Sequence, residues 1–87
     1  MKFEFDPAKS ASNHAKHGID FVTAQAIWID PDRLEVLARS VDEPRVQVIG
    51  RVGPAVWSAF VTIREGRIRM ISVRRARNEE EAAYSDS

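Results

Sequence analysis

The spacing of apolar residues changes along the chain, and the change falls at Asp30 and Pro31. Before this point, apolar residues recur every three or four positions, as on a helix that buries one face, at Phe21, Ala24, Ile27 and Trp28. After it, apolar and polar residues alternate, as in strands whose successive side chains point to opposite faces. Proline favours a helix end here, because it pushes the preceding residue out of the helical region. The chain is therefore predicted to form helices first and a sheet afterwards.

The N-terminal segment predicts one short strand and two helices. Phe3 and Phe5 alternate with charged residues, which is typical of a half-buried strand. Asp6 is predicted to cap the first helix, because proline follows it at the first helical position. Gly18 is predicted to end that helix near residue 17 by supplying a left-handed residue, and Asp20 to cap the second helix.

Four strands in hairpin order are predicted after Pro31, at residues 34–38, 45–51, 56–64 and 67–75. Glycines in segments 53–54 and 64–66 indicate tight turns. Asn78 is predicted to cap a short last helix whose first turn holds three glutamates, at the positive end of the helix dipole. The predicted fold class is α+β, as a small single domain over residues 1–87. Its twisted antiparallel sheet combines the N-terminal strand with a four-stranded meander, strand 67–75 is central, and the two N-terminal helices pack on one face.

Charge is segregated along the chain, although its formal net value is zero. Residues 64–77 hold six arginines and one glutamate, whereas residues 78–87 hold four acidic residues and no basic one. The chain has no cysteine, which excludes disulfides and thiolate chemistry. It has no apolar run near the roughly 20 residues needed to span a bilayer, and its N-terminus lacks the apolar stretch of a signal peptide. A cytoplasmic protein is expected.

The arginine-rich segment 64–77 has two interpretations. Arginine suits phosphate, because its planar fork donates two hydrogen bonds and its charge does not titrate. The segment is therefore a candidate for binding an anionic partner, but arginine-rich strands are also common as solvated edges that resist aggregation. Strict alternation predicts one face with Arg67, Arg69, Ile71, Val73 and Arg75, and the other with Ile68, Met70, Ser72 and Arg74.

Two blocks of sequence resemble the BrnT family of toxins. The N-terminal block is Phe5-Asp6-Pro7-Ala8-Lys9, with Asn13, Lys16-His17-Gly18-Ile19 and Phe21. The second comprises Arg45, Ile49-Gly50-Arg51 and Arg67-Ile68-Arg69-Met70-Ile71-Ser72-Val73-Arg74-Arg75-Ala76, and acidic residues with a tyrosine close the chain at 79–84. The resemblance implies a ribonuclease toxin of a type II toxin–antitoxin pair with a RelE-like fold, which inhibits translation and growth. It also implies a DNA-binding, BrnA-like antitoxin that folds over the toxin, and we expect a heterotetramer built on an antitoxin dimer.

The residue types can be matched to metal-free RNA cleavage, for which no cofactor is expected. The reaction needs a base for the 2′-hydroxyl, cations for the crowded phosphorane and an acid for the leaving 5′-oxygen. The candidate catalytic residues are His17 as the near-neutral base, Arg51 and Arg74 as phosphate clamps, Ser72 as a donor and Tyr84 as a proton donor. The candidate RNA phosphate contacts are Lys16, Arg67, Arg69, Arg75 and Arg77.

Alternatives remain open for both the residues and the function. His17 stands in the last turn of its helix, where a histidine can simply bond the terminal carbonyls. His14 and His17 have a spacing that can hold a metal, but no third ligand of the right type stands near, so a metal site is not predicted. The alternative function is a non-catalytic module whose arginine-rich sheet binds RNA or an acidic partner helix.

Overall fold

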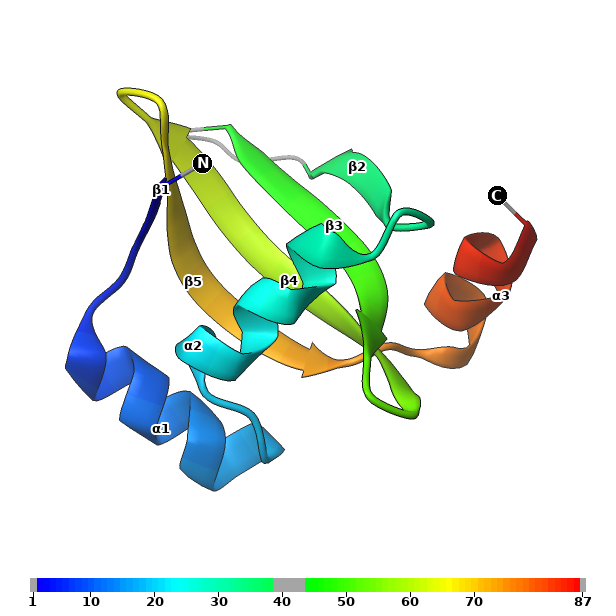
Figure 1. Ribbon diagram of the computed structural model, residues 1–87, viewed down its shortest axis with the longest axis horizontal. Helices are drawn as coiled ribbons and strands as arrows, with labels where there is room; N and C mark the ends of the chain where they lie inside the picture. The colour runs from blue at the N-terminus through cyan, green and yellow to red at the C-terminus, as the bar shows by residue number, and fades with distance from the viewer. Residues whose placement is uncertain (1, 39–43, 87) are drawn as a thin grey trace.

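The N- and C-terminal parts of the chain meet in one five-stranded sheet (Figure 1). The computed structural model describes residues 2–38 and 44–86, so the predicted connection before residue 45 lies largely outside the described residues. The strands are β1 (Lys2–Glu4), β2 (Leu34–Ala38), β3 (Arg45–Val52), β4 (Ala55–Arg64) and β5 (Arg67–Arg75). The helices are α1 (Pro7–His17), α2 (Phe21–Ala24), the 3-10 helix η1 (Gln25–Ile29) and α3 (Asn78–Asp86). This arrangement confirms the α+β class.

The sheet is mixed, so the prediction of a wholly antiparallel sheet is wrong. Its strand order is β1-β5-β4-β3-β2, and the four strands after residue 33 form the predicted antiparallel meander. In contrast, β1 pairs with β5 in parallel, with Lys2 opposite Arg67 and Glu4 opposite Arg69. A hairpin turn imposes antiparallel pairing on its two strands, but β1 leads into α1 rather than into a turn. Its direction is therefore set by tertiary packing, and β5 lies between β1 and β4.

The ends of α1 and the start of α2 follow the predicted capping residues, whereas Asn78, predicted to cap the last helix, is the first residue of α3. Asp6 Oδ1 accepts a hydrogen bond of 2.9 Å from the backbone N–H of Ala8, and Gly18 ends α1 with a φ of 81°. Asp20 Oδ1 accepts a hydrogen bond of 2.7 Å from the backbone N–H of Thr23 and starts α2. The predicted second helix is a single α-helical turn that continues as the tighter η1. These ends confirm that local sequence controls where the N-terminal helices start and stop.

A β-bulge interrupts the alternation of β5. The register between β4 and β5 passes from Phe60 opposite Ser72 to Val61 opposite Met70, so Ile71 is an extra residue. An extra residue shifts the side-chain alternation of its own strand by one position. The predicted division of residues 67–75 into two strictly alternating faces is therefore wrong on one side of Ile71.

The bulge brings polar residues from both halves of β5 to one face. Ile68, Met70 and Val73 all enter the same buried cluster, against α2 and η1. The opposite face of β3, β4 and β5 carries polar, aromatic and cationic side chains instead. We call it the open face, and its residues include Gln47, Ser58, Phe60, Arg67, Arg69, Ser72 and Arg74. Of the described helices, α3 packs near one end of this face, where β5 finishes (Figure 1).

Asn13 attaches α1 to the edge of β5 beyond β1. Its Nδ2 donates to the carbonyls of Ile19 and Val73, at 2.8 and 3.0 Å, and its Oδ1 accepts from the N–H of Val73 at 3.1 Å. These bonds satisfy buried backbone groups that have no strand partner at this edge, since β1 pairs only with residues 67–69. The longest described helix is α1, with 11 residues, and none in this part of the chain is long and apolar enough to cross a membrane.

Candidate functional site

Arg74 on β5 anchors a cluster of polar side chains on the open face. Its guanidinium donates two parallel hydrogen bonds to the carboxylate of Glu80, from Nη1 at 2.7 Å and Nη2 at 2.9 Å. The Phe60 ring lies beside it, with its centroid 5.2 Å from Cζ, and Nη1 also donates to the carbonyl of Arg75. Ring and carbonyl both restrict the orientation of the guanidinium. The side chain is 23% exposed, so the charge sits at the boundary between core and solvent.

Glu80 fills the space between Arg74 and two neutral donors from the sheet. Gln47 Nε2 donates to it at 2.6 Å, and Ser58 Oγ donates to it at 3.1 Å. The backbone N–H of Arg77, where α3 begins, donates to it at 2.9 Å. The hydrogen bonds from Arg74 make the largest contribution to lowering the pKa of Glu80 to about 2. Glu80 is therefore a carboxylate at neutral pH, and the pair holds the pKa of Arg74 above its ordinary value.

Sequence reasoning missed four members of this cluster: Gln47, Ser58, Phe60 and Glu80. The available signal was strand pairing, since Ser58 and Phe60 stand opposite Arg74 and Ser72 in the β4–β5 hairpin. Gln47 lies on β3, which flanks β4 on the side away from β5, and it stands opposite Phe60. Their side chains reach one another only because β3, β4 and β5 are adjacent in that order. Ser72 is on the open face with Arg74, as predicted.

Arg51 and Tyr84 form a second cluster, centred on Asp30. Tyr84 donates its hydroxyl to Asp30 Oδ2 at 2.6 Å, and the backbone N–H of Arg51 donates to the same oxygen at 2.8 Å. The Arg51 guanidinium lies 5.8 Å from the centre of the Tyr84 ring. Burial by itself would raise the pKa of Asp30, but these hydrogen bonds outweigh it and lower the pKa. The bond to Asp30 makes the largest contribution to raising the pKa of Tyr84, so the phenol remains protonated at neutral pH.

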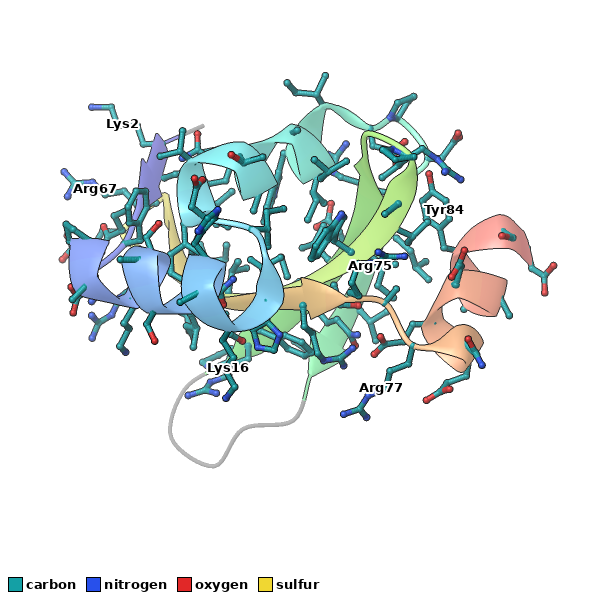
Figure 2. The ribbon with its side chains drawn as sticks, turned by 90° about the horizontal axis from the view of Figure 1, so that it is seen from below. Lys2, Lys16, Arg67, Arg75, Arg77 and Tyr84 are labelled. Carbon is teal, nitrogen blue, oxygen red and sulfur yellow. The ribbon has the colours of Figure 1, made fainter. Side chains whose placement is uncertain are left out.

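His17 and Lys16 stand at the end of α1, along the outer edge of β5. Figure 2 shows α1 and β5 running in the same direction, and Asn13 fixes α1 beside Val73. His17 follows Asn13 by four helical residues, a rise of about 6 Å or nearly two strand residues. His17 is therefore near the level of Arg75, with a half-buried side chain. The exposed Lys16 precedes it on the same turn (Figure 2).

The other predicted phosphate contacts lie in separate places. Figure 2 shows Arg67 beside Lys2 at one end of the molecule, and Arg75, Arg77 and Tyr84 toward the other. Arg67 and Arg69 form ion pairs with Glu4, at 3.8 and 3.0 Å. Five strand residues separate Arg69 from Arg74, a distance of roughly 15 Å. Arg67 and Arg69 are therefore far from the Arg74 cluster.

Arg75 differs from Arg74 in the face that it occupies. Its guanidinium lies 5.4 Å from the centre of the Trp57 ring, and Trp57 packs against the buried cluster under the helices. Arg75 therefore points away from the open face, as the alternation of adjacent residues predicts. Arg77 follows β5 and is exposed. Within residues 2–38 and 44–86, no group of three or more His, Cys, Asp or Glu side chains is placed to hold a metal ion.

Comparison with known proteins connects this fold to one family. A family model described as the ribonuclease toxin BrnT of type II toxin–antitoxin systems matches residues 5–80. The match begins just after β1 and includes both N-terminal helices, η1, the meander and the start of α3 through Glu80. No curated protein matches the chain.

Proposed function

This chain belongs to the BrnT family of ribonuclease toxins of type II toxin–antitoxin systems, and on that premise we propose a mechanism. We propose that it cleaves RNA without a metal ion, by attack of the 2′-oxygen on the adjacent phosphate. The proposed reaction takes place at the end of β5, around Arg74, Ser72 and the C-terminal end of α1. Membership of a type II family also implies a protein antitoxin as partner.

The observation that carries this proposal is the placement of Arg74. Its fork lies on the open face, is restricted by Phe60 and the Arg75 carbonyl, and already binds a carboxylate through both terminal nitrogens. A phosphate presents two oxygens to arginine in the same manner as a carboxylate. A positively charged group that is already oriented stabilises the charge of the phosphorane without first having to reorganise.

The proposed steps balance as a transesterification. A base removes the proton of the 2′-hydroxyl, the 2′-oxygen forms a bond to phosphorus, and the bond from phosphorus to the 5′-oxygen breaks. The leaving 5′-oxygen takes a proton from an acid. The products are one strand with a 2′,3′-cyclic phosphate and one with a 5′-hydroxyl. We assign the base to His17, which stands at the edge of β5 near the level of Arg75.

Arg51 and Tyr84 have a less direct place in this scheme. Tyr84 keeps its proton at neutral pH, as an acid must before the reaction, because the pKa of a phenol is ordinarily about 10 and the hydrogen bond to Asp30 raises it further. The Arg51 guanidinium beside the Tyr84 ring would hold a neighbouring phosphate. We therefore propose Tyr84 as the proton donor and Arg51 as a second phosphate contact.

The remaining basic residues suit binding along an RNA strand. Arg67 and Arg69 on the open face, with Lys16, Arg75 and Arg77 near the end of β5, would contact phosphates away from the scissile one. Phe60 on the open face presents an aromatic ring beside Arg74, and unstacked RNA bases pack on such rings. These residues would position the RNA, whereas the reaction depends on Arg74.

The test of this mechanism uses RNA cleavage by the purified chain. We expect cleavage to persist in EDTA, to yield a 2′,3′-cyclic phosphate and to fail on RNA with 2′-deoxy at the scission site. Arg74→Ala should slow single-turnover cleavage of saturating RNA by about a hundredfold or more, by analogy with loss of an oxyanion donor. Arg67→Ala, from the same strand, should weaken binding but leave the saturated rate within about twofold. Full activity of a folded Arg74→Ala variant would contradict the mechanism.

The role of His17 has a matched control in His14, on the same helix. His17→Ala should slow saturated cleavage by about a hundredfold if the imidazole transfers a proton, and His14→Ala should leave the rate unchanged. Equal rates for both variants would show that His17 serves only its helix. RNA binding without cleavage by the unmodified chain would favour the non-catalytic module, and loss of cleavage in EDTA would favour a metal site.

The proposed partner is a DNA-binding, BrnA-like antitoxin with an acidic segment that covers the open face. The arginines of the open face would attract such an acidic segment. Once the segment covers the open face, RNA cannot reach it. We propose a heterotetramer built on an antitoxin dimer. Co-expression with the neighbouring gene, followed by light scattering of the purified complex, should give the mass of two copies of each chain. Recovery of this chain as a monomer with no co-eluting protein would contradict the proposal.

A further inference from the structure

The carboxylate of Glu80 occupies the part of the open face that the proposed mechanism needs for phosphate. Arg74 directs both terminal nitrogens at Glu80, and Gln47 and Ser58 donate to the same two oxygens. An Arg74 that binds Glu80 in this way has no terminal nitrogen directed at an RNA phosphate. The site as it stands is therefore filled by a group from the chain itself.

We infer that Arg74, Gln47 and Ser58 form a binding site for an RNA phosphate, and that α3 covers it by inserting Glu80 as an internal substitute. This inference rests on the proposed function, because it assumes that RNA reaches the open face. RNA then has to displace Glu80, and the first turn of α3 must move for cleavage to occur, whereas Tyr84 stays at Asp30. Only the molecules in which the site is free can bind RNA. The cover therefore lowers the apparent affinity of the chain for RNA in proportion to the fraction of such molecules.

The three donors remain in place without α3. Gln47, Ser58 and Arg74 lie on the adjacent strands β3, β4 and β5, and Gln47 Nε2 also donates to Ser58 Oγ at 3.2 Å. Arg74 keeps its contacts with the Phe60 ring and the Arg75 carbonyl, which also belong to the sheet. The departure of Glu80 would therefore leave a preformed anion site rather than a collapsed one.

The packing of α3 is suited to a cover that can move. Only Glu80 and Tyr84 turn inward from this helix, at positions i and i+4, and its other described side chains are exposed. Tyr84 is 8% exposed and contacts Ile49 and Val56 in a small apolar cluster separate from the main core. A helix of nine residues is marginal without such contacts. Tyr84 can thus hold the second half of α3 on the sheet while the first turn releases Glu80.

The test compares three glutamates of the same helix by their effect on RNA binding. A short 2′-O-methyl RNA serves as the probe because it cannot be cleaved, and fluorescence anisotropy gives its Kd. Glu80→Gln should tighten binding by about tenfold, whereas Glu79→Gln and Glu81→Gln, which remove the same charge from exposed positions, should have much smaller effects. The gain should vanish in an Arg74→Ala background, since the released site includes Arg74. Equal or weaker binding by Glu80→Gln relative to these controls would overturn the inference.

A second measurement uses the unmodified chain and so does not depend on the folding of any variant. Hydrogen exchange of the backbone amides in residues 81–83 should become faster when the 2′-O-methyl RNA binds, because the first turn of α3, to which these amides bond, leaves the sheet with Glu80. Bound RNA with unchanged protection of α3 would overturn the inference. These readouts report binding alone, so they separate the cover from the cleavage mechanism. Cleavage by the chain with no selective effect of Glu80→Gln refutes only the cover, and a selective effect without cleavage refutes only the nuclease mechanism.

Discussion

Replacing Asn13 with alanine should lower the free energy of unfolding strongly, because this one side chain makes three hydrogen bonds. The Asn13 side chain is buried and makes three hydrogen bonds to backbone groups of Ile19 and Val73. In Asn13→Ala, two carbonyls and one N–H lose these partners. A buried polar group without a partner costs about 1–3 kcal/mol. At the edge of β5, where water can reach part of the gap, about 1 kcal/mol for each bond is appropriate, or about 3 kcal/mol in total.

This loss is a large share of the stability of a chain of this size. A domain of 87 residues typically has a free energy of unfolding of about 4–13 kcal/mol. With a urea dependence of about 1.5 kcal/mol per molar, the midpoint of unfolding should fall by about 2 M. Fluorescence of Trp28 and Trp57 can follow the transition. Ser12→Ala, at the exposed neighbouring position of α1, should change the free energy of unfolding by less than about 0.5 kcal/mol. A loss below about 1 kcal/mol for Asn13→Ala would refute the reasoning.

Two further predictions concern the two sides of the sheet. Gly50→Ala should destabilise the fold by about 1–3 kcal/mol in urea unfolding, because its added Cβ would lie 2.9 Å from Ile27 Cγ2 and 3.3 Å from the Ile27 carbonyl; unchanged stability would contradict this contact. The pair of Glu80 and Arg74 should contribute about 1–2 kcal/mol above pH 4.5, after allowance for solvent screening, and lose it as the pH falls toward about 2, because the folded state lowers the pKa of Glu80 from 4.5. Unfolding curves between pH 6 and 3 should show this slope in the unmodified chain and in Glu79→Gln but less of it in Glu80→Gln, and equal slopes in all three would contradict it.

The sequence predicted Ser72 and Arg74 of the candidate site, but neither the other members of the Arg74 cluster nor the contacts between them. The resemblance to BrnT toxins predicted the family, and the family model that matches residues 5–80 confirms it. The prediction that Ser72 and Arg74 share a face is also confirmed. No pattern in the sequence connects Arg74 with Glu80, or Tyr84 with Asp30. Tyr84 and Asp30 are 54 positions apart, and their contact exists only when α3 meets the end of η1. Pairs of this kind depend on the path of the chain between them.

The features that the sequence determined by itself are those that depend on a few neighbouring residues. Asp6 and Gly18 set the ends of α1 through a cap within two residues and a left-handed backbone. Glu65 and Gly66, both with positive φ, turn β4 into β5. Such signals act over one turn of chain, so they survive in any tertiary context.

Only the tertiary structure decided the direction of β1, the bulge at Ile71 and the group that fills the Arg74 site. Each depends on which strands become neighbours and in what register. The alternation of apolar residues is nearly the same on both sides of Ile71, so the sequence pattern does not reveal a shift by one position. That shift moves Arg67 and Arg69 onto the face of Arg74, because a single extra residue exchanges the two faces of every residue beyond it.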